Sequence, residues 1–319
     1  MNIAEKRIPQ DGRIQTDING QPVDMRVSIL PTIHGEKTVI RILAKNDGNL
    51  NRKYLGINEH NNELINKIVQ VPQGICLISG PTGSGKTTTL YTLLAEKNSP
   101  DTNIITIEDP VEIQIPGLNQ VQVNVKAGMT FASGLRSVLR QDPDIVLVGE
   151  IRDGETADIA MRAAITGHLV FSTIHTNDAV SSINRLIDMG LEPYMVSSAL
   201  VGVVSQRLVR RICTSCRKSY DPDESEMTLI KLEPGQKLYK GEGCTDCNGS
   251  GYKGRIAIHE IVIISRKMKA LLERRASEDD MRKLAVEEGT QMLKDSAAEL
   301  VLEGITTMDE LKRVAYSID

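Results

Sequence analysis

The chain has 319 residues, a formal net charge of −4 and only 3% aromatic residues, with an ordinary 40% of hydrophobic and 25% of charged residues. This length and composition predict a globular protein of two or three domains. The acidic balance and the scarcity of aromatic side chains argue against an extended nucleic-acid-binding surface. No apolar stretch is long enough for a transmembrane helix, and the first residues lack the apolar core of a signal peptide. We therefore expect a cytosolic protein that reaches the membrane only through partners.

Residues 1–45 are predicted to form a small antiparallel sheet. Apolar and polar residues alternate in three segments: 12–18, 23–30 and 37–43. Asn19-Gly20 is a hairpin signal between the first two segments. Arg26 and Arg41 fall within these strands, where a solvated face is the simpler interpretation. Because three strands make a thin domain, we expect this sheet to be the C-terminal part of a larger one.

Residues 46–60 are polar and turn-rich and are expected to form a linker. A helix is predicted at 61–69, where apolar residues recur on one face. From there to residue 207, helical patterns alternate with four short apolar runs: 75–78, 103–107, 145–148 and 169–172. This alternation predicts a mostly parallel sheet with helices on its faces. Ligands of such sheets bind beyond the carboxyl ends of the strands.

The first apolar run leads into a glycine-rich loop and then into a helical pattern. The loop reads Gly80, Pro81, Thr82, Gly83, Ser84, Gly85, Lys86 and Thr87, with Thr88 following. It matches the phosphate-loop pattern G-x-x-x-x-G-K-[ST] in the strand–loop–helix context that the pattern requires. Glycines let the backbone N–H groups turn toward phosphate oxygens. Lys86 is expected to neutralise the β- and γ-phosphates, and the Thr87 hydroxyl to ligate Mg²⁺.

Two carboxylates follow the next two apolar runs. Glu108 stands at the end of 103–107, where either a plain turn or a role in positioning water or Mg²⁺ fits the pattern. Glu150 follows four apolar residues, and Gly149 occupies the position where the usual Walker B pattern has an aspartate. Glu150 is therefore predicted to orient the attacking water or to hold the metal.

The histidines His168 and His175 flank the fourth apolar run. Each alone is compatible with a hydrogen-bonded structural histidine. Beside a nucleotide site, the pair could instead report on the γ-phosphate. Arg185 falls on the helix that is predicted to follow.

Four cysteines form two C-x-x-C pairs, Cys213/Cys216 and Cys244/Cys247. This spacing predicts a tetrahedral metal site, most simply for Zn²⁺. Because four thiolates leave no coordination position open, the site is expected to be structural. Residues 208–257 are therefore interpreted as a metal-binding subdomain, and 258–319 as a helical region.

The chain resembles the type II secretion and type IV pilus assembly ATPases over essentially its whole length. The resemblance is carried by the N-terminal segments 8–14, 24–32 and 35–43 and by four boxes in order: 80–87, 107–110, 148–153 and 166–177. It implies an α/β fold with a RecA-like P-loop NTPase core at 61–207, after a truncated PAS-like sheet domain. It further implies a cytoplasmic hexameric ring that hydrolyses ATP and drives an inner-membrane platform protein.

The resemblance also implies roles for individual residues. Glu150 matches the Walker B glutamate, and Glu108 matches the Asp-box carboxylate that polarises water. The family arginines that reach the γ-phosphate match Arg26, Arg41 and Arg185, and the His box matches His168 and His175. The tetracysteine subdomain is similar to that of assembly and secretion motors and is absent from retraction motors. We expect that the N-terminal docking module of the family is missing from this chain.

Two other functions fit the same sequence pattern. A RecA-like nucleic-acid translocase shares the core, although the acidic charge speaks against it. A scaffold that binds ATP without hydrolysing it is the third alternative. Steady-state phosphate release separates that scaffold from a motor.

Overall fold

The N-terminal strands pair as the alternation predicts. In the computed structural model, β1 (Gln10–Ile18), β2 (Gln21–Thr32) and β3 (Gly35–Leu43) form an antiparallel sheet in the order β1-β2-β3. The described residues are 1–18, 20–43, 50–230, 232–233 and 235–315. Asn19 of the predicted hairpin turn and residues 46–49 of the predicted linker therefore lie outside the described residues. The chain divides into two units, Met1–Asn49 and Leu50–Asp319, which we describe separately.

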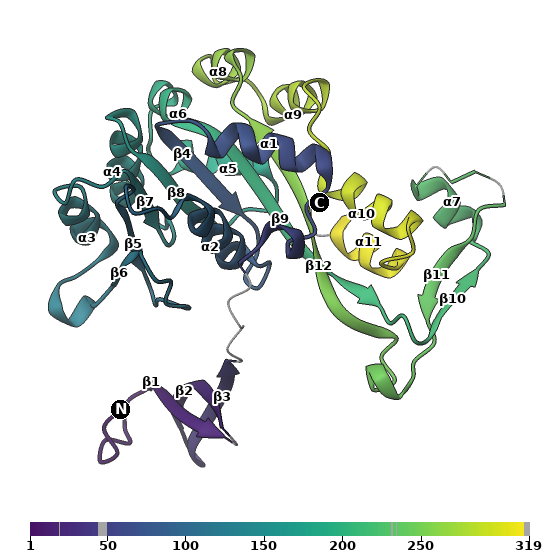
Figure 1. Cartoon of the computed structure of the whole chain (residues 1–319), viewed down its shortest axis with the longest axis horizontal. Coiled ribbons are helices and arrows are strands. Elements are labelled where there is room, and N and C mark those ends of the chain that lie inside the picture. Colours follow the sequence, from purple (N-terminus) through teal and green to yellow (C-terminus); the bar gives the residue numbers. More distant parts are fainter. Residues whose placement is uncertain (19, 44–49, 231, 234, 316–319) are drawn as a thin grey trace. The chain divides into compact units, whose positions relative to one another are not determined.

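The second unit is built on a seven-stranded sheet in the order β12-β9-β4-β8-β7-β5-β6 (Figure 1). Its strands are β4 (Gly74–Ser79), β5 (Ile104–Glu108), β6 (Asn119–Gln122), β7 (Ile145–Val148), β8 (Leu169–Ile174), β9 (Leu200–Ile212) and β12 (Tyr252–Ile263). Every neighbouring pair from β9 to β6 is parallel, and β12 runs antiparallel to β9. The four predicted apolar runs are confirmed as β4, β5, β7 and β8.

Both faces of this sheet are covered, which explains why its central strands are apolar at every position. Cys76 and Ile78 of β4 pack into one core with α1 (Glu59–Val69) and α2 (Lys86–Lys97). Ile75 and Leu77 pack into the other core. The helices of that second face are α3 (Phe131–Val138), α4 (Gly154–Ile165), α5 (Ala179–Asp188), α6 (Pro193–Ala199), α8 (Arg266–Glu273) and α9 (Glu278–Glu287).

A third apolar cluster lies where the C-terminal half of β9 pairs with β12. It contains Val209 and Ile258 together with residues of α10 (Leu293–Leu302) and α11 (Met308–Ala315). Beyond them, β10 (Arg217–Tyr220) and β11 (Leu238–Gly241) form a two-stranded ribbon with α7 (Glu224–Ile230) between them in sequence. Three short 3-10 turns complete the description: Arg52–Tyr54, Val125–Ala127 and Thr245–Cys247.

The prediction that residues from 258 onward are helical is wrong for its first segment. Residues 258–263 are the end of β12, and helices begin at Arg266. The alternation in β12 is hidden because His259 and Glu260 are buried although they are polar. Among the residues that the structure describes, no helix is both long and apolar enough to cross a bilayer.

Candidate functional site

The phosphate loop connects β4 to α2 at the carboxyl edge of the parallel strands. Gly80 and Gly85 have φ angles of 141° and 88°, a region that disfavours side chains. A Cβ atom on Gly80 would also lie 2.3 Å from the carbonyl oxygen of Gln206 on β9. The glycines of the motif are therefore required both by the loop conformation and by the strand packed behind it.

Lys86 begins α2 and is buried, with 8% of its surface exposed. Its Nζ donates hydrogen bonds to the carbonyl oxygens of Gly80, at 2.7 Å, and Pro81, at 3.1 Å. Burial lowers the pKa of Lys86, and the charge of Glu150 opposes that shift. The loop thus encloses a desolvated ammonium group, while Thr87 and Thr88 are exposed at the same edge.

Glu150 lies just beyond β7 and belongs to a charged cluster. It forms an ion pair with Arg152, and its Oε2 lies 3.6 Å from Nε2 of His175. Burial lowers the pKa of His175, and the charge of Lys86 lowers it further. Both effects favour the neutral imidazole, while the charge of Glu150 opposes them.

Gly149 has a structural reason for replacing the usual aspartate. Its N–H donates to the carbonyl oxygen of Ile107 at 2.8 Å, so β7 continues past its last strand residue along β5. A Cβ atom at Gly149 would lie 3.2 Å from that oxygen and 3.3 Å from Cα of Glu108. The close approach of the two strand ends leaves Glu150 as the carboxylate that follows β7.

Glu108 ends β5 and is buried, with 4% exposed. Its Oε1 accepts hydrogen bonds from Thr106 at 2.6 Å and from Gln120 at 3.3 Å. Its Oε2 accepts a hydrogen bond from Tyr91 of α2. Both carboxylate oxygens are therefore engaged by protein donors, which fixes this side chain between α2 and the strands β5 and β6.

The structure brings Lys86, Glu150 and His175 together, but it does not bring His168 to them. His168 precedes β8, at the opposite end of that strand from His175. Its Nδ1 donates to the carbonyl oxygen of Ala163 at 3.0 Å, near the end of α4. This contact is the structural arrangement that one of the two sequence interpretations predicts.

Of the three arginines suggested by the resemblance, one belongs to the second unit and two belong to the first. Arg185 is exposed in the last turn of α5 and, within the described residues, makes no side-chain hydrogen bond or ion pair. Arg26 and Arg41 belong to the first unit, where they are direct register partners on β2 and β3. Arg13 of β1 is the register partner of Arg26 on its other side. The register thus places three arginines in one row across the sheet, on one of its faces.

The four cysteines predicted to bind metal do converge. Their sulfur atoms all lie within 4.8 Å of one another, with Sγ–Sγ distances of 3.8 Å for Cys213–Cys244 and Cys216–Cys247 and 3.7 Å for Cys244–Cys247. A tetrahedron with metal–sulfur bonds of about 2.3 Å has edges of about 3.8 Å. Backbone N–H groups of Gly243 and Gly251 donate to Cys216 and Cys247 at 3.3 Å. The donor set and spacing fit a Zn²⁺ ion.

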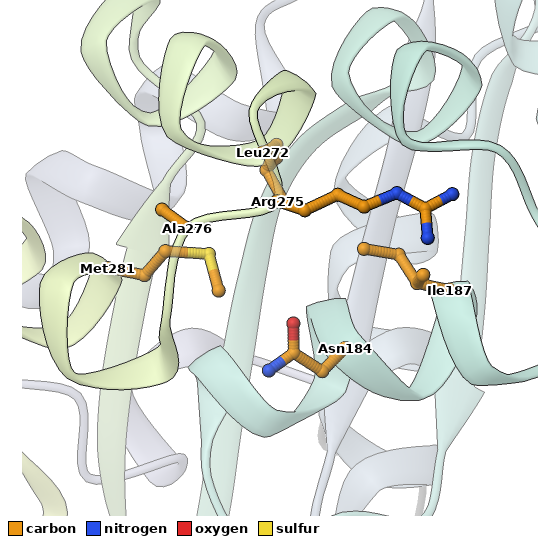
Figure 2. A pocket seen from close by; sticks show the side chains of 6 residues that line it. All are labelled: Asn184, Ile187, Leu272, Arg275, Ala276 and Met281. Carbon is orange, nitrogen blue, oxygen red and sulfur yellow. The ribbon is translucent and has the colours of Figure 1, made fainter.

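A small pocket of about 130 Å³ lies away from these groups, between α5, α8 and α9 (Figure 2). Its lining residues are Asn184, Ile187, Leu272, Arg275, Ala276 and Met281. None of them belongs to the phosphate loop or to the Glu150 cluster.

Comparison with known proteins shows to which family the chain belongs. The sequence profile of the family described as "Type II/IV secretion system protein" matches residues 1–313. The chain belongs to this family. The resemblance noted from the sequence motifs is therefore confirmed.

This Type II/IV secretion system family member has close curated relatives. It is 49% identical over 316 residues to the type II secretion system protein E of Pseudomonas aeruginosa, covering 98% of this chain and 63% of that protein. It is 48% identical over 315 residues to the type IV pilus assembly ATPase PilB of Thermus thermophilus, covering 98% of this chain and 35% of that protein. The chain thus spans less than two thirds of the length of either relative.

Two solved structures share the fold of this family member. The pilus retraction motor PilT with bound ADP matches with a TM-score of 0.70 and 26% identity, over 95% of this chain and 77% of that one. The Legionella pneumophila ATPase DotB matches in fold with a TM-score of 0.70 and 20% identity, over 97% of this chain and 78% of that one. The predicted α/β fold with a RecA-type ATPase core is confirmed.

Sequence reasoning missed three polar residues of this family member's site: Tyr91 and Gln206, which are buried, and Gln120, which is half-buried. Tyr91 and Gln120 reach the site through Glu108, and Gln206 reaches it from the distant strand β9 through Ser84. The available signal was a polar residue inside an apolar stretch, as with Gln206 after the run Val203-Val204. A buried polar group of this kind needs a partner, so its position marks a point of contact.

Proposed function

We propose that the chain is the ATP-hydrolysing part of a motor that drives type II protein secretion or type IV pilus assembly. The observation that carries the proposal is the buried Lys86 ammonium, enclosed by the phosphate loop and electrostatically coupled to Glu150 beyond β7. A cation for phosphates and a carboxylate for water, at one edge of a parallel sheet, are the two groups that phosphoryl transfer to water requires.

In this proposal the backbone of Gly80–Thr88 and the Lys86 side chain bind the phosphates of ATP. The Thr87 hydroxyl would hold Mg²⁺, which neutralises developing charge on the phosphates. Glu150 orients the attacking water, its ion pair with Arg152 holds the carboxylate in place, and His175 lies beside it. Glu108 supports this edge of the site through Tyr91 and, in the role that the family resemblance gives it, polarises the water.

The remaining roles in this proposal rest on the family resemblance. Arg26, Arg41 and Arg185 would reach the γ-phosphate, in a hexameric ring in which units of neighbouring chains meet. The ring would act on the cytoplasmic face of the inner membrane, through a platform protein. One Zn²⁺ held by Cys213, Cys216, Cys244 and Cys247 would stabilise the subdomain that contains β10 and β11, and no nucleic acid would take part.

Phosphate release from Mg·ATP tests the proposal. Lys86→Ala is expected to abolish nucleotide binding, because Lys86 is the basic residue in the sequence of the loop. Glu150→Gln is expected to bind ATP but to lose turnover by about 10²-fold or more, since the amide cannot act as a base. Lys67→Ala on α1 and Glu155→Gln on α4, which change exposed residues, are the matched controls. Full turnover in Lys86→Ala or Glu150→Gln would refute the assignment, and so would an inactive wild-type protein that also fails to bind ATP.

A further inference from the structure

Gln206 of β9 contacts the phosphate loop from behind and is buried, with 1% exposed. Both polar atoms of its side-chain amide form hydrogen bonds. Nε2 donates to the carbonyl oxygen of Ser84 at 2.7 Å, and Oε1 accepts from Oγ1 of Thr89 at 2.7 Å. Ser84 lies in the loop and Thr89 in the first turn of α2. One side chain thus joins the loop to the helix that follows it.

The backbone around Gln206 is equally close to the loop. A Cβ atom on Gly85 would lie 2.9 Å from Nε2 of Gln206, and one on Gly80 would lie 2.3 Å from its carbonyl oxygen. The two outer glycines of the motif therefore face the same residue. Because β9 pairs in parallel with β4, which leads into the loop, the strand and the loop form one packed unit.

The hydrogen bond to Ser84 sets the direction of a peptide group. In a trans peptide the C=O and the following N–H point in opposite directions. When Gln206 holds the Ser84 carbonyl toward β9, the Gly85 N–H is turned away from β9, toward the space that the loop encloses. Anion binding by such loops depends on N–H groups that converge in this way.

We propose that Gln206 is a positioning residue for the nucleotide phosphates. It aims the Gly85 N–H at a bound phosphate and, through Thr89, fixes the first turn of α2 whose amino end faces the same anion. This proposal rests on the ATP site proposed above and assigns to β9 a part in phosphate recognition.

Only glutamine meets both requirements at this depth. Leucine would leave the Ser84 carbonyl and the Thr89 hydroxyl without Gln206 as partner, and the Ser84–Gly85 peptide would be free to rotate. Its carbonyl dipole would then face the phosphates and repel them. Glutamate could accept from Thr89 but could not donate to Ser84, and its charge would oppose the anion.

Calorimetric titration of the full chain with Mg·ATP tests this role. Gln206→Leu is expected to weaken ATP binding about tenfold or more, the effect of losing one or two buried hydrogen bonds. The matched control is Ser205→Ala, on the same strand. Ser205 is equally buried, and its hydroxyl has no hydrogen-bond partner within the described part of the chain. The control should bind ATP within about twofold of wild type.

Thr89 provides a second test that leaves Gln206 in place. Thr89→Val keeps the side-chain shape but removes the hydroxyl that Gln206 accepts from, whereas Thr89→Ser restores it. We expect Thr89→Val to weaken ATP binding several-fold and Thr89→Ser to recover most of the loss. In the double variant Gln206→Leu/Thr89→Val, the losses should be less than multiplicative, because both changes remove the same contact.

The outcomes separate this inference from the proposed function. Equal ATP affinity in Gln206→Leu and Ser205→Ala would overturn the role of Gln206 even if Lys86→Ala abolishes binding. Independent, multiplicative losses in the double variant would overturn it as well. Absence of ATP binding in the wild-type protein would instead overturn the ATP site itself.

Discussion

Tyr91 of α2 donates its hydroxyl hydrogen to the Glu108 carboxylate at the end of β5, and both side chains are buried. The same hydroxyl accepts the N–H of Glu112 at 3.2 Å. The helix that starts at the phosphate loop is therefore tied to the strand end that carries the second conspicuous carboxylate. Burial raises the pKa of Tyr91, and Glu108 raises it further, so the phenol remains a donor across the physiological range.

Tyr91→Phe removes this donor without changing the ring. Because Glu108 is buried and would lose the partner of its Oε2, we expect the free energy of unfolding to fall by about 1–3 kcal/mol. Urea denaturation monitored by circular dichroism measures the change. Tyr54→Phe, at a tyrosine that is 70% exposed, is the control and should change stability by less than about 0.5 kcal/mol. Equal stability of the two variants would show that the Tyr91–Glu108 bond contributes nothing.

Glu310 of α11 is a second buried carboxylate that we expect to contribute to the free energy of unfolding. Only 1% of its side chain is exposed, and it accepts hydrogen bonds from the Arg210 backbone at 2.8 Å and from the Arg210 and Arg313 side chains at 2.9 and 2.8 Å. Glu310→Gln should cost about 1.5–3 kcal/mol of unfolding free energy, the range for hydrogen bonds to a charged group. Thermal and urea unfolding measure it, with the exposed Glu303→Gln as control. A loss no greater than that of the control would contradict the prediction.

The burial of His259 predicts that the protein loses stability in acid. It lies on β12 directly opposite Gln206 in the strand register, and burial lowers its pKa from 6.5 to about 4. The folded state therefore binds fewer protons than the unfolded state between these values, and stability falls as the pH falls from 6.5 toward 4. At pH 5 this single group should have cost about 2 kcal/mol relative to pH 7.

His259→Leu should remove that acid-sensitive component. We expect the drop in unfolding free energy between pH 7 and pH 5 to be smaller in this variant than in wild type, while the exposed His34→Leu control matches wild type. Burial raises the pKa of the neighbouring Glu260 to about 6. This group therefore adds to the free energy of unfolding as the pH falls from about 6 to 4.5. This opposite contribution is common to all three proteins and cancels in the comparison. Identical pH dependence in wild type and His259→Leu would refute the assignment.

Metal removal should destabilise the tetracysteine subdomain. We expect about one zinc per chain by elemental analysis, and loss of that zinc in Cys244→Ser, because a thiolate vertex of the tetrahedron is gone. Cys76→Ala, at the buried cysteine of β4, should retain the metal. Hydrogen exchange of β10 and β11 should accelerate in Cys244→Ser but not in Cys76→Ala. Protein purified without chelators that contains no zinc would count against the site.

The parts of the fold that can be predicted are those marked by a short, local pattern of residue types. The runs 75–78 and 169–172 are apolar throughout because helices cover both faces of the sheet, and the glycine-rich loop carries its own sequence pattern. The two C-x-x-C pairs likewise specify their own convergence. In each case the feature is announced by one short segment, or, for the cysteines, by two short motifs of fixed spacing.

What the sequence pattern could not predict depends on partners far away in the chain. β9 and β12 contain buried polar residues, and Gln206 and Glu260 among them are stabilised by contacts with Thr89 and with the backbone N–H groups of Ala179 and Leu293. Without those contacts in view, such segments do not look like core strands. Glu108 shows the same limit, since the sequence left a turn and a site role equally open, and Tyr91 and Gln120 account for its burial.

Strand β9 has one further consequence. It has 13 residues, from Leu200 beside β4 to Ile212, directly before Cys213. At about 3.3 Å per residue this is a continuous ribbon of about 40 Å. Its middle residue, Gln206, contacts the phosphate loop, and its last residue, Ile212, directly precedes the first cysteine of the thiolate cluster. The phosphate loop and the metal-binding subdomain therefore share one strand as their common support.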